Sequence, residues 1–122
     1  MNYSASVPIY LQVMDSIKEK IVTGKIPPGE KLPSGRDLAL QYTINPNTAA
    51  RVYQMLEQEQ VCFTRRGLGT FVTEDHDRIR RLKEEMAEKL LREFMDGLAK
   101  LGISGEEAAE MIRTTMKQQM TE

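Results

Sequence analysis

In "INPNTAARVYQML", residues 44–56, a proline stands near the front of what otherwise reads as a good helix. Because an interior proline removes a backbone donor and clashes with the preceding turn, the helix is expected to begin at Pro46. Asn45 is a favoured N-cap residue, whose side-chain oxygen can accept from a free N–H group. Asn47 and Thr48 then lie in a first turn with free N–H groups and the positive end of the helix dipole. This end of the helix is suited to meeting an anion.

Two helices are expected before this one. The segment "PIYLQVMDSIKEKIVTGK", residues 8–25, ends near the stop signal Gly24 and has apolar residues at helical spacing, namely Tyr10, Val13, Ile17 and Ile21. After the proline-rich connection "IPPGEKLP", Ser34 opens a short helix, with Asp37 three residues on in a variant of the capping box. The inward faces expected for the second and third helices are Leu38, Ala39 and Tyr42, and Ala49, Val52, Tyr53 and Leu56.

After Gln60 the pattern changes to that of β-strands. "VCFTRRGLGTFVT", residues 61–73, has two β-rich arms around a glycine-containing loop, which predicts a hairpin. Cys62 in the first arm is most simply a small buried hydrophobe. The order helix, helix, helix, hairpin suits a winged helix-turn-helix. The expected fold class is mainly α with a small β-hairpin, with a winged helix-turn-helix domain over residues 1–74 and a two-helix dimerisation tail over residues 75–122.

Composition sets limits on the function. Of the 122 residues 40% are hydrophobic and 29% are charged, which is ordinary for one small globular domain with an appended element. The net charge is −1, and residues 1–74 hold eight Lys and Arg against seven Asp and Glu. Binding to nucleic acid would therefore rest on a few placed side chains and not on a broad positive field. One cysteine excludes an internal disulfide, and without a signal core or a membrane-spanning run the cytoplasm is the expected compartment.

No arrangement of residues favours an enzyme. With one histidine in the chain there is no Ser/His/Asp or Cys/His set, and "GLGT" lacks the strand-to-helix context of a phosphate-binding loop. His76 lies in "EDHDR", the expected linker, where a solvated position is favoured over a metal site because no second histidine or cysteine cluster accompanies it. No catalytic residue, metal or cofactor is therefore predicted.

Four fragments in order carry a resemblance to a known family. They are "PIYLQV", the run G-x-I-x-P-G-x-x-L-P-S-x-R-x-L-A from Gly24 to Ala39, "NPNT" from Asn45 to Thr48, and G-x-G-T-F-V from Gly67 to Val72. Over about residues 7–73 the chain resembles the DNA-binding domain of the GntR family of bacterial transcription regulators. The short tail and the "NPNT" sequence resemble the YtrA-like subfamily, in which two helices after the winged domain make a homodimer.

The resemblance implies DNA contacts at three places. They are the start of the second helix, the recognition helix and the wing, with Ser34 and Arg36, then Asn45, Asn47 and Thr48, then Arg66, Gly67 and Gly69. Two further arginines join this prediction. Arg51 stands next to Ala50, where several members have an arginine, and Arg65 precedes Arg66 at a wing tip of the kind that enters a narrow minor groove.

The residues themselves leave a plainer alternative beside each contact. Arg36 would reach a phosphate or a guanine edge, or it would pair with Asp37 on the surface. The polar pair at the recognition helix would read bases or phosphates, or it would only fill a solvated first turn, and the wing arginines would enter a groove or belong to a solvated loop. The chain also has Thr43 and Gln60 where many family members have glycine, before and after the recognition helix.

The tail reads as two helices. The first has an apolar stripe at steps of three or four, ended by Gly102 and formed by Ile79, Leu82, Met86, Leu90, Phe94, Leu98 and Leu101. Ser104 starts the second helix, with Glu107 closing a capping box. Its buried side would be Ala108, Met111, Ile112, Thr115 and Met116. These stripes need cover from the winged domain, from each other or from a second copy, and a symmetric dimer covers them all at once.

The expected function is that of a DNA-binding transcription regulator, a repressor that binds a palindromic operator as a homodimer. Two recognition helices about one DNA turn apart would match an inverted repeat and double the phosphate contacts. The methionines of the tail would line a pocket for a small-molecule effector of unknown identity or, as is favoured, form core and dimer interface. The alternative function is a protein interaction module whose winged domain does not read DNA and whose tail docks a partner. No membrane partner is expected.

Overall fold

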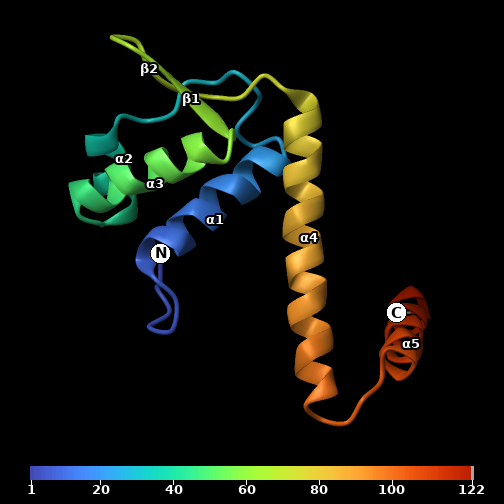
Figure 1. Ribbon diagram of the computed structural model, residues 1–122. Coiled ribbons are helices and arrows are strands. Elements are labelled where there is room, and N and C mark those ends of the chain that lie inside the picture. Colours follow the sequence, from blue (N-terminus) through green and yellow to red (C-terminus); the bar gives the residue numbers. More distant parts are fainter. Residues whose placement is uncertain (122) are drawn as a thin grey trace. The chain divides into compact units, whose positions relative to one another are not determined.

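The computed structural model describes residues 1–121 (Figure 1). The elements in this part of the chain are α1 (Ile9–Val22), α2 (Gly35–Tyr42), α3 (Pro46–Gln58), β1 (Cys62–Arg65), β2 (Gly69–Val72), α4 (His76–Ala99) and α5 (Gly105–Thr121). The expected class, mainly α with a small β-hairpin, is confirmed. The chain divides into two compact units, the N-terminal unit Met1–Lys83 and the C-terminal unit from Glu84 onward.

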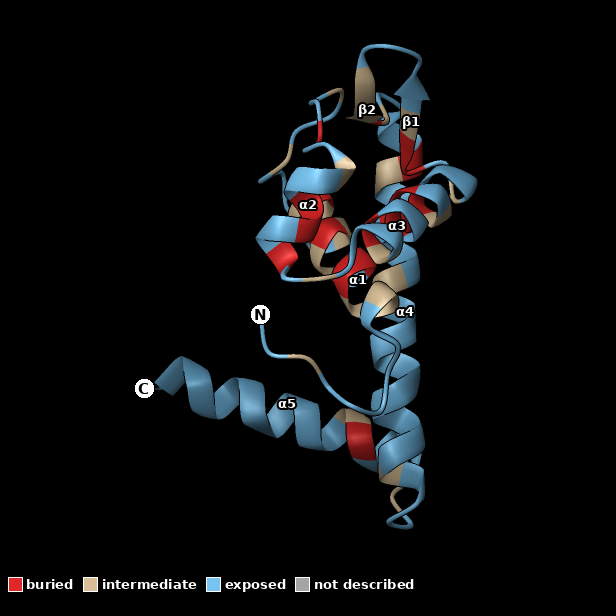
Figure 2. Cartoon of the chain, turned by 90° about the vertical axis from the view of Figure 1, so that its left-hand side faces the viewer, coloured by how far each residue is buried: buried red, intermediate tan, exposed pale blue. Residues whose placement is uncertain are grey.

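The core of the N-terminal unit lies where α1, α2 and α3 face one another, as the buried positions in Figure 2 show. The expected inward faces of α2 and α3 are confirmed, because all seven of those residues are buried. On α1 the buried residues are Val13, Met14, Ile17 and Ile21. Tyr10 stands at the outer end of this face and is only half-buried. Its ring is therefore available to a side chain from outside the core.

The beginnings of α2 and α3 are confirmed at the residues predicted for them. Ser34 precedes α2, and its Oγ accepts from the backbone N of Asp37 at 3.1 Å. Asn45 precedes α3, and its Oδ1 accepts from the backbone N of Asn47 at 2.7 Å. Pro46 takes the first position of α3, where its missing N–H group costs nothing. Local capping chemistry thus places both helix N-termini.

Two residues that follow helices adopt a left-handed backbone. Thr43 follows α2 with φ +54, and Gln60 follows α3 with φ +61. A left-handed conformation brings Cβ close to a carbonyl oxygen and costs about 1–2 kcal/mol for a residue other than glycine. Both turns are closed by backbone bonds of 2.9 Å, from Ile44 N to Ala39 O and from Val61 N to Leu56 O. These bonds explain how the turns form at the two positions where the resembled family has glycine.

Thr43→Gly is expected to raise the free energy of unfolding by about 1 kcal/mol, because glycine adopts this φ without the Cβ contact. Urea denaturation would measure the change. Thr23→Gly is the matched control, since Thr23 ends α1 at φ −92 and its hydroxyl donates to Glu19 O at 2.6 Å. The control should lose stability. Equal losses in the two variants would contradict the strain assigned to Thr43.

The predicted hairpin is confirmed, with β1 and β2 antiparallel and Phe63 opposite Phe71. These two rings stack with their centroids 5.7 Å apart. A third segment runs beside β2, because Lys31 forms a bridge with Phe71 and Leu32 N donates to Thr70 O at 2.8 Å. The hairpin extends away from α1, α2 and α3 (Figure 1). Three paired segments, β1, β2 and the stretch at Lys31 and Leu32, therefore support the tip of the hairpin.

Cys62 is buried at the start of β1, as predicted, with 3% of its surface exposed. Burial, with a smaller contribution from Glu57, raises the pKa of the thiol to about 12. The thiol therefore stays protonated at neutral pH and behaves as a small hydrophobic side chain.

The start of α4 belongs to the N-terminal unit. His76 is the first residue of α4, so the expectation that it lies in a linker is wrong. The physical reason is a cap, because Asp75 Oδ1 accepts from the backbone N of Asp77 at 3.0 Å and of Arg78 at 3.2 Å. Arg78 is 7% exposed, and its Nε donates to Glu59 O, just after α3, at 2.9 Å. Leu82, at 1% exposure, completes the core of this unit.

The C-terminal unit contains the rest of α4 and all of α5. The capping box is confirmed, because Ser104 Oγ accepts from Glu107 N at 3.2 Å and lies 3.3 Å from Glu107 Oε1. α4 ends at Ala99, so Leu101 lies in the turn after the helix and does not continue its stripe. The helix stops earlier than predicted because the backbone N of Ile103 bonds Leu98 O at 3.1 Å and closes the turn.

The buried side predicted for α5 is largely exposed in a single chain. Ala108 is 1% exposed, but Met111, Ile112 and Met116 are 51%, 40% and 58% exposed. Figure 2 shows the same contrast, with one buried position on α5. Two helices have too little surface between them to cover both apolar faces. The prediction that these residues are buried is therefore wrong for one copy of the chain.

Candidate nucleic-acid interface

The first turn of α3 carries free polar groups. Asn47 is exposed and Thr48 is half-buried. Within residues 1–121 neither the Asn47 amide nor the Thr48 hydroxyl has a hydrogen-bond partner. They lie at the positive dipole end of a 13-residue helix. This turn can therefore offer both donors and acceptors to a base edge or a phosphate.

The first turn of α2 adds a cation. Arg36 is exposed, and no carboxylate in the described chain pairs with it. The structure does not show the alternative in which Arg36 pairs with Asp37, because no ion pair joins these two side chains within residues 1–121. An arginine without a partner keeps all its donors for an outside anion.

Partly buried hydrogen bonds anchor α2 and α3 to their neighbours. Tyr53 of α3 donates from its hydroxyl to Pro33 O at 2.5 Å, one residue before the cap of α2. Burial raises the pKa of Tyr53, so the hydroxyl remains a donor. At the other end of α2 the Tyr42 hydroxyl lies 2.9 Å from Ser16 Oγ and 3.2 Å from Lys20 Nζ, both on α1. The two N-termini are therefore held by the core and not by flexible loops.

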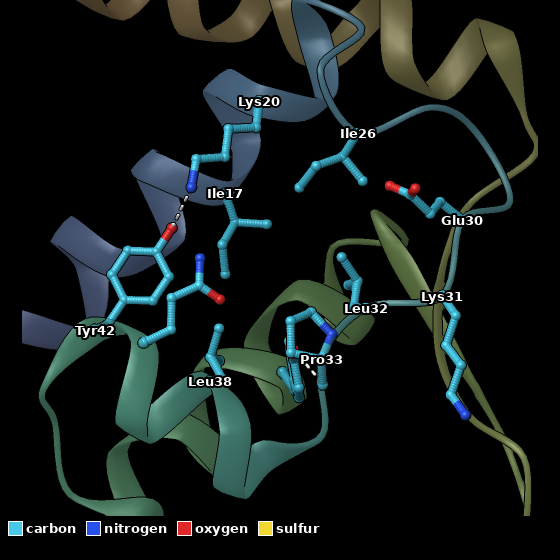
Figure 3. Close-up of a pocket in the computed structure, with 11 residues that line it drawn as sticks. Ile17, Lys20, Ile26, Glu30, Lys31, Leu32, Pro33, Leu38 and Tyr42 are labelled. Carbon is cyan, nitrogen blue, oxygen red and sulfur yellow. Dashed lines mark hydrogen bonds between the residues drawn. The ribbon is translucent and has the colours of Figure 1, made fainter.

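A cavity of about 320 Å³ lies between α1, α2 and the connection that joins them (Figure 3). Its walls are mainly apolar, from Ile17, Ile26, Leu32, Leu38 and Tyr42. The figure shows Lys20 reaching Tyr42 at one end, whereas Lys31 points away at the other. The cavity lies behind α2 and leaves its first turn exposed.

The hairpin tip carries the wing residues that were predicted. Arg65, Arg66 and Gly67 are exposed. The Arg65 guanidinium stacks over the Phe63 ring at 5.4 Å, whereas Arg66 has no partner in residues 1–121. Gly67 has φ +79, a backbone conformation that suits glycine at the turn. The tip thus presents two cations, one at the end of β1 and one on the short loop that follows it.

The Lys31 side chain lies against Gly69, a contact that the sequence did not predict. Gly69 has φ +123, and a Cβ there would lie 2.8 Å from Lys31 Cε. Lys31 therefore crosses the hairpin tip and adds a third cation to it. Sequence reasoning had treated Lys31 as part of a proline-rich connection. The only signal was its position one residue before Leu32 in the run shared with the resembled family.

Arg51 is on the exposed side of α3, but its guanidinium lies 3.9 Å from the centre of the Tyr10 ring on α1. This cation–π contact holds the charge at the edge of the exposed face. Gln54 also lies on this exposed face, one helical turn after Ala50, and is not among the predicted contact residues. The helical period that predicted the buried face of α3 also places Gln54 on the opposite, exposed face.

No three His, Cys, Asp or Glu side chains of residues 1–121 come together in a way that could hold a metal ion. No helix in the same residues is long and apolar enough to cross a membrane.

Three packed helices, a hairpin and polar groups at the starts of α2 and α3 define a winged helix-turn-helix protein. The sequence model of a protein family, described as bacterial regulatory proteins of the gntR family, matches residues 9–72. The chain is 39% identical over 112 residues to the HTH-type transcriptional regulator YhcF of Bacillus subtilis. This alignment covers 92% of this chain and 93% of YhcF. It is 44% identical over 71 residues to the HTH-type transcriptional repressor YtrA of Bacillus subtilis, in an alignment that covers 58% of this chain and 55% of YtrA.

A solved structure agrees with these matches. A GntR family transcriptional regulator from Listeria monocytogenes superposes with a TM-score of 0.84 at 38% identity, over 92% of this chain and 98% of that one. The chain therefore belongs to the GntR family of bacterial transcription regulators. It is a DNA-binding transcription regulator and not an enzyme.

Proposed function

We propose that this regulator binds an inverted-repeat operator as a homodimer and represses transcription by blocking access of the polymerase. The first turn of α3 enters the major groove, and the hairpin tip reaches the neighbouring minor groove. The observation that carries the proposal is a set of exposed side chains, at the two helix starts and the hairpin tip, without partners in the described chain: Arg36, Asn47 and Arg66. Such groups can bind DNA without first breaking an internal contact.

The chemistry of each side chain assigns its role in the major groove. The Asn47 amide matches the donor and acceptor pair of an adenine edge. Arg36 and Thr48 bond phosphates or a neighbouring base. Ser34 and Asn45 already cap their helices, so they contribute their remaining hydrogen-bonding capacity to the backbone of the duplex. Arg51, held against Tyr10, lies where a flanking phosphate would pass.

In the wing Arg66 and Arg65 neutralise phosphates on either side of the minor groove. Gly67 and Gly69 allow the backbone to come close to the groove, because neither has a side chain to hold it away. The wing contributes mainly affinity, whereas the α3 contacts contribute sequence discrimination.

Residues 1–74 are the DNA-binding domain and residues 75–122 the dimerisation region. The compact units divide later, after Lys83, so the first turns of α4 pack with the N-terminal unit. The C-terminal unit supports a role in dimerisation, since large apolar side chains are exposed along both of its helices: Leu90, Leu91, Phe94 and Met95 on α4, and Met111, Ile112, Met116 and Met120 on α5. Exposed apolar surface of this extent marks an interaction site. A second copy of the chain covers each stripe with its own equivalent.

Not every predicted dimer residue contributes equally to this face. Leu82 is already buried in the N-terminal unit and Ile79 is half-buried, so the face begins after them. Met86 and Leu98 are half-buried, and Leu101 contributes from the turn after α4. Two joined copies double the phosphate contacts of a chain with almost no net charge.

The repressor role rests on similarity to YtrA, whose name is that of a transcriptional repressor. Because a bacterial transcription regulator acts on DNA, we expect this protein to work in the cytoplasm. A small-molecule effector would act at the dimer face of α4 and α5, where methionines can adapt to a ligand.

Selection of bound duplexes from a random pool tests the whole proposal. The recovered sequence should be an inverted repeat with half-sites about one DNA turn apart. Gel shifts of that duplex and of a random duplex, each at two salt concentrations, then give specificity and the number of phosphate contacts. Recovery of a single half-site, or of no motif, would contradict the paired arrangement.

Arg66→Ala is expected to weaken binding to operator and random duplex alike. The slope of log K against log salt should fall by about 0.9 for each phosphate that is no longer neutralised, and so by about 2 in a dimer. Arg80→Ala is the matched control, because it removes the same charge from a side chain already paired with Asp77 at 3.4 Å. An unchanged slope for Arg66→Ala would exclude Arg66 from the phosphate contacts.

A further inference from the structure

The tip of the hairpin exposes an apolar side chain. Leu68 is 59% exposed between Gly67 and Gly69, whose φ angles are +79 and +123. Leu68 N donates to Arg65 O at 2.9 Å, which closes the turn and fixes the backbone of the leucine. A turn between two strands more often carries a polar residue at such a position. The leucine is therefore held away from any core, at the furthest point of the hairpin.

Positive charge surrounds this leucine. Arg65 and Arg66 come immediately before the turn, and Lys31 crosses Gly69 immediately after it. None of these three side chains pairs with a carboxylate within the described chain. An exposed leucine among unpaired cations is poorly suited to an apolar protein partner, since the cations would have to be desolvated. It is suited to a partner that is apolar at its centre and anionic on both sides.

We propose that Leu68 enters the minor groove as a wedge between two stacked base pairs, with Arg65, Arg66 and Lys31 on the flanking phosphates. This inference rests on the proposed operator binding by the wing. The base stack supplies the apolar centre and the two phosphate strands supply the anions. Leucine is one of the side chains that proteins insert in this way, and the insertion kinks the duplex toward the major groove.

The hairpin is rigid enough to carry a wedge. Phe63 and Phe71 stack across the two strands, and the bridge from Lys31 to Phe71 adds a third segment beside them. Unstacking a base step costs free energy, so a wedge on a mobile loop would bend away instead of entering. The pairing of these three protein segments resists that bending.

The wedge also gives the wing a sequence preference without a hydrogen bond to any base. Pyrimidine–purine steps such as TA unstack more easily than others, and a narrow A·T minor groove attracts arginine. The operator should therefore have a TA or CA step under each hairpin tip, outside the bases that α3 reads. Replacing a TA step by the stiffer AA step should lower affinity even though the minor-groove acceptors of the A·T pairs are kept.

The experiment uses the full chain and the duplex recovered by random selection, with 2-aminopurine at the step under the hairpin tip. Wild-type protein should raise the 2-aminopurine fluorescence and bend the duplex by about 20° or more, measured by circular permutation. Leu68→Ser should remove most of both signals and weaken operator binding about ten-fold, with an unchanged salt slope. Leu68→Met should retain both signals. Leu40→Ser, at a leucine 73% exposed on α2, is the matched control.

The outcomes separate this inference from the operator proposal. A wild-type complex that is specific and salt-dependent, but unbent and without a fluorescence change, overturns the wedge and leaves operator binding in place. A Leu68→Ser complex bent as strongly as wild type overturns it also. If wild-type protein selects no duplex at all, the proposed function fails first and the wedge fails with it.

Discussion

Leu90→Glu combined with Phe94→Glu is expected to give a monomer that binds the operator at least about 100-fold more weakly than the parent. The two side chains are 67% and 45% exposed in one chain, so the change should not unfold the monomer. In a dimer each glutamate would be buried against a second apolar stripe, where an unpaired carboxylate is costly. Separated half-sites then lose the gain of about 10²–10⁴ that two linked contacts provide.

Sedimentation equilibrium measures the first effect, as a fall from twice the chain mass of 13.9 kDa to the chain mass itself. Lys89→Gln with Arg92→Gln is the matched control, since it changes the net charge equally on the opposite side of α4. The control should remain dimeric. A glutamate variant that stays dimeric, or a parent chain that is already a monomer at working concentration, would end the dimer proposal.

Asn47→Ala is expected to lower the discrimination between operator and random duplex by about 1–3 kcal/mol for each half-site. The loss should appear in specific binding only, because an amide that reads a base edge adds little to non-specific affinity. The Asn47 side chain has no partner in residues 1–121 and alanine favours helices, so α3 should remain intact. Competition gel shifts against random duplex would measure the ratio.

Gln58→Ala is the control for this change. Gln58 is exposed on the same side of α3, three helical turns further on and away from the first turn. It should leave the ratio of specific to random binding unchanged. Equal effects of the two variants would mean that α3 lies along the groove and does not enter it by its first turn, whereas no effect of Asn47→Ala would leave base reading to other residues.

The helix starts could be predicted because their causes are local. Asn45 caps a turn two residues away, Pro46 fixes the first position of the helix, and Ser34 bonds the N–H three residues on. Such signals need only a few neighbouring residues and the same rules in every fold. The inward face of α3 follows equally from the helical period, and the hairpin from two β-rich arms around glycines.

Several contacts could not be predicted, because their partners are distant in sequence. Arg78, which is 7% exposed, bonds the end of α3 from 19 residues away. Arg51 stacks on Tyr10, which the spacing alone had placed with the apolar residues of α1. These pairs have no local pattern, since any exposed arginine has the same short-range environment.

The sequence by itself determined the order of elements, the exact start of the recognition helix and the family, because caps, prolines and helical periods act within a turn or two of chain. Only the tertiary structure decided which charges remain unpaired and which are held by a ring or a carbonyl oxygen. It also brought Lys31 across Gly69 and so placed three cations around Leu68. Those arrangements depend on packing between segments far apart in the chain, and pairing over such distances is fixed only once the core has formed.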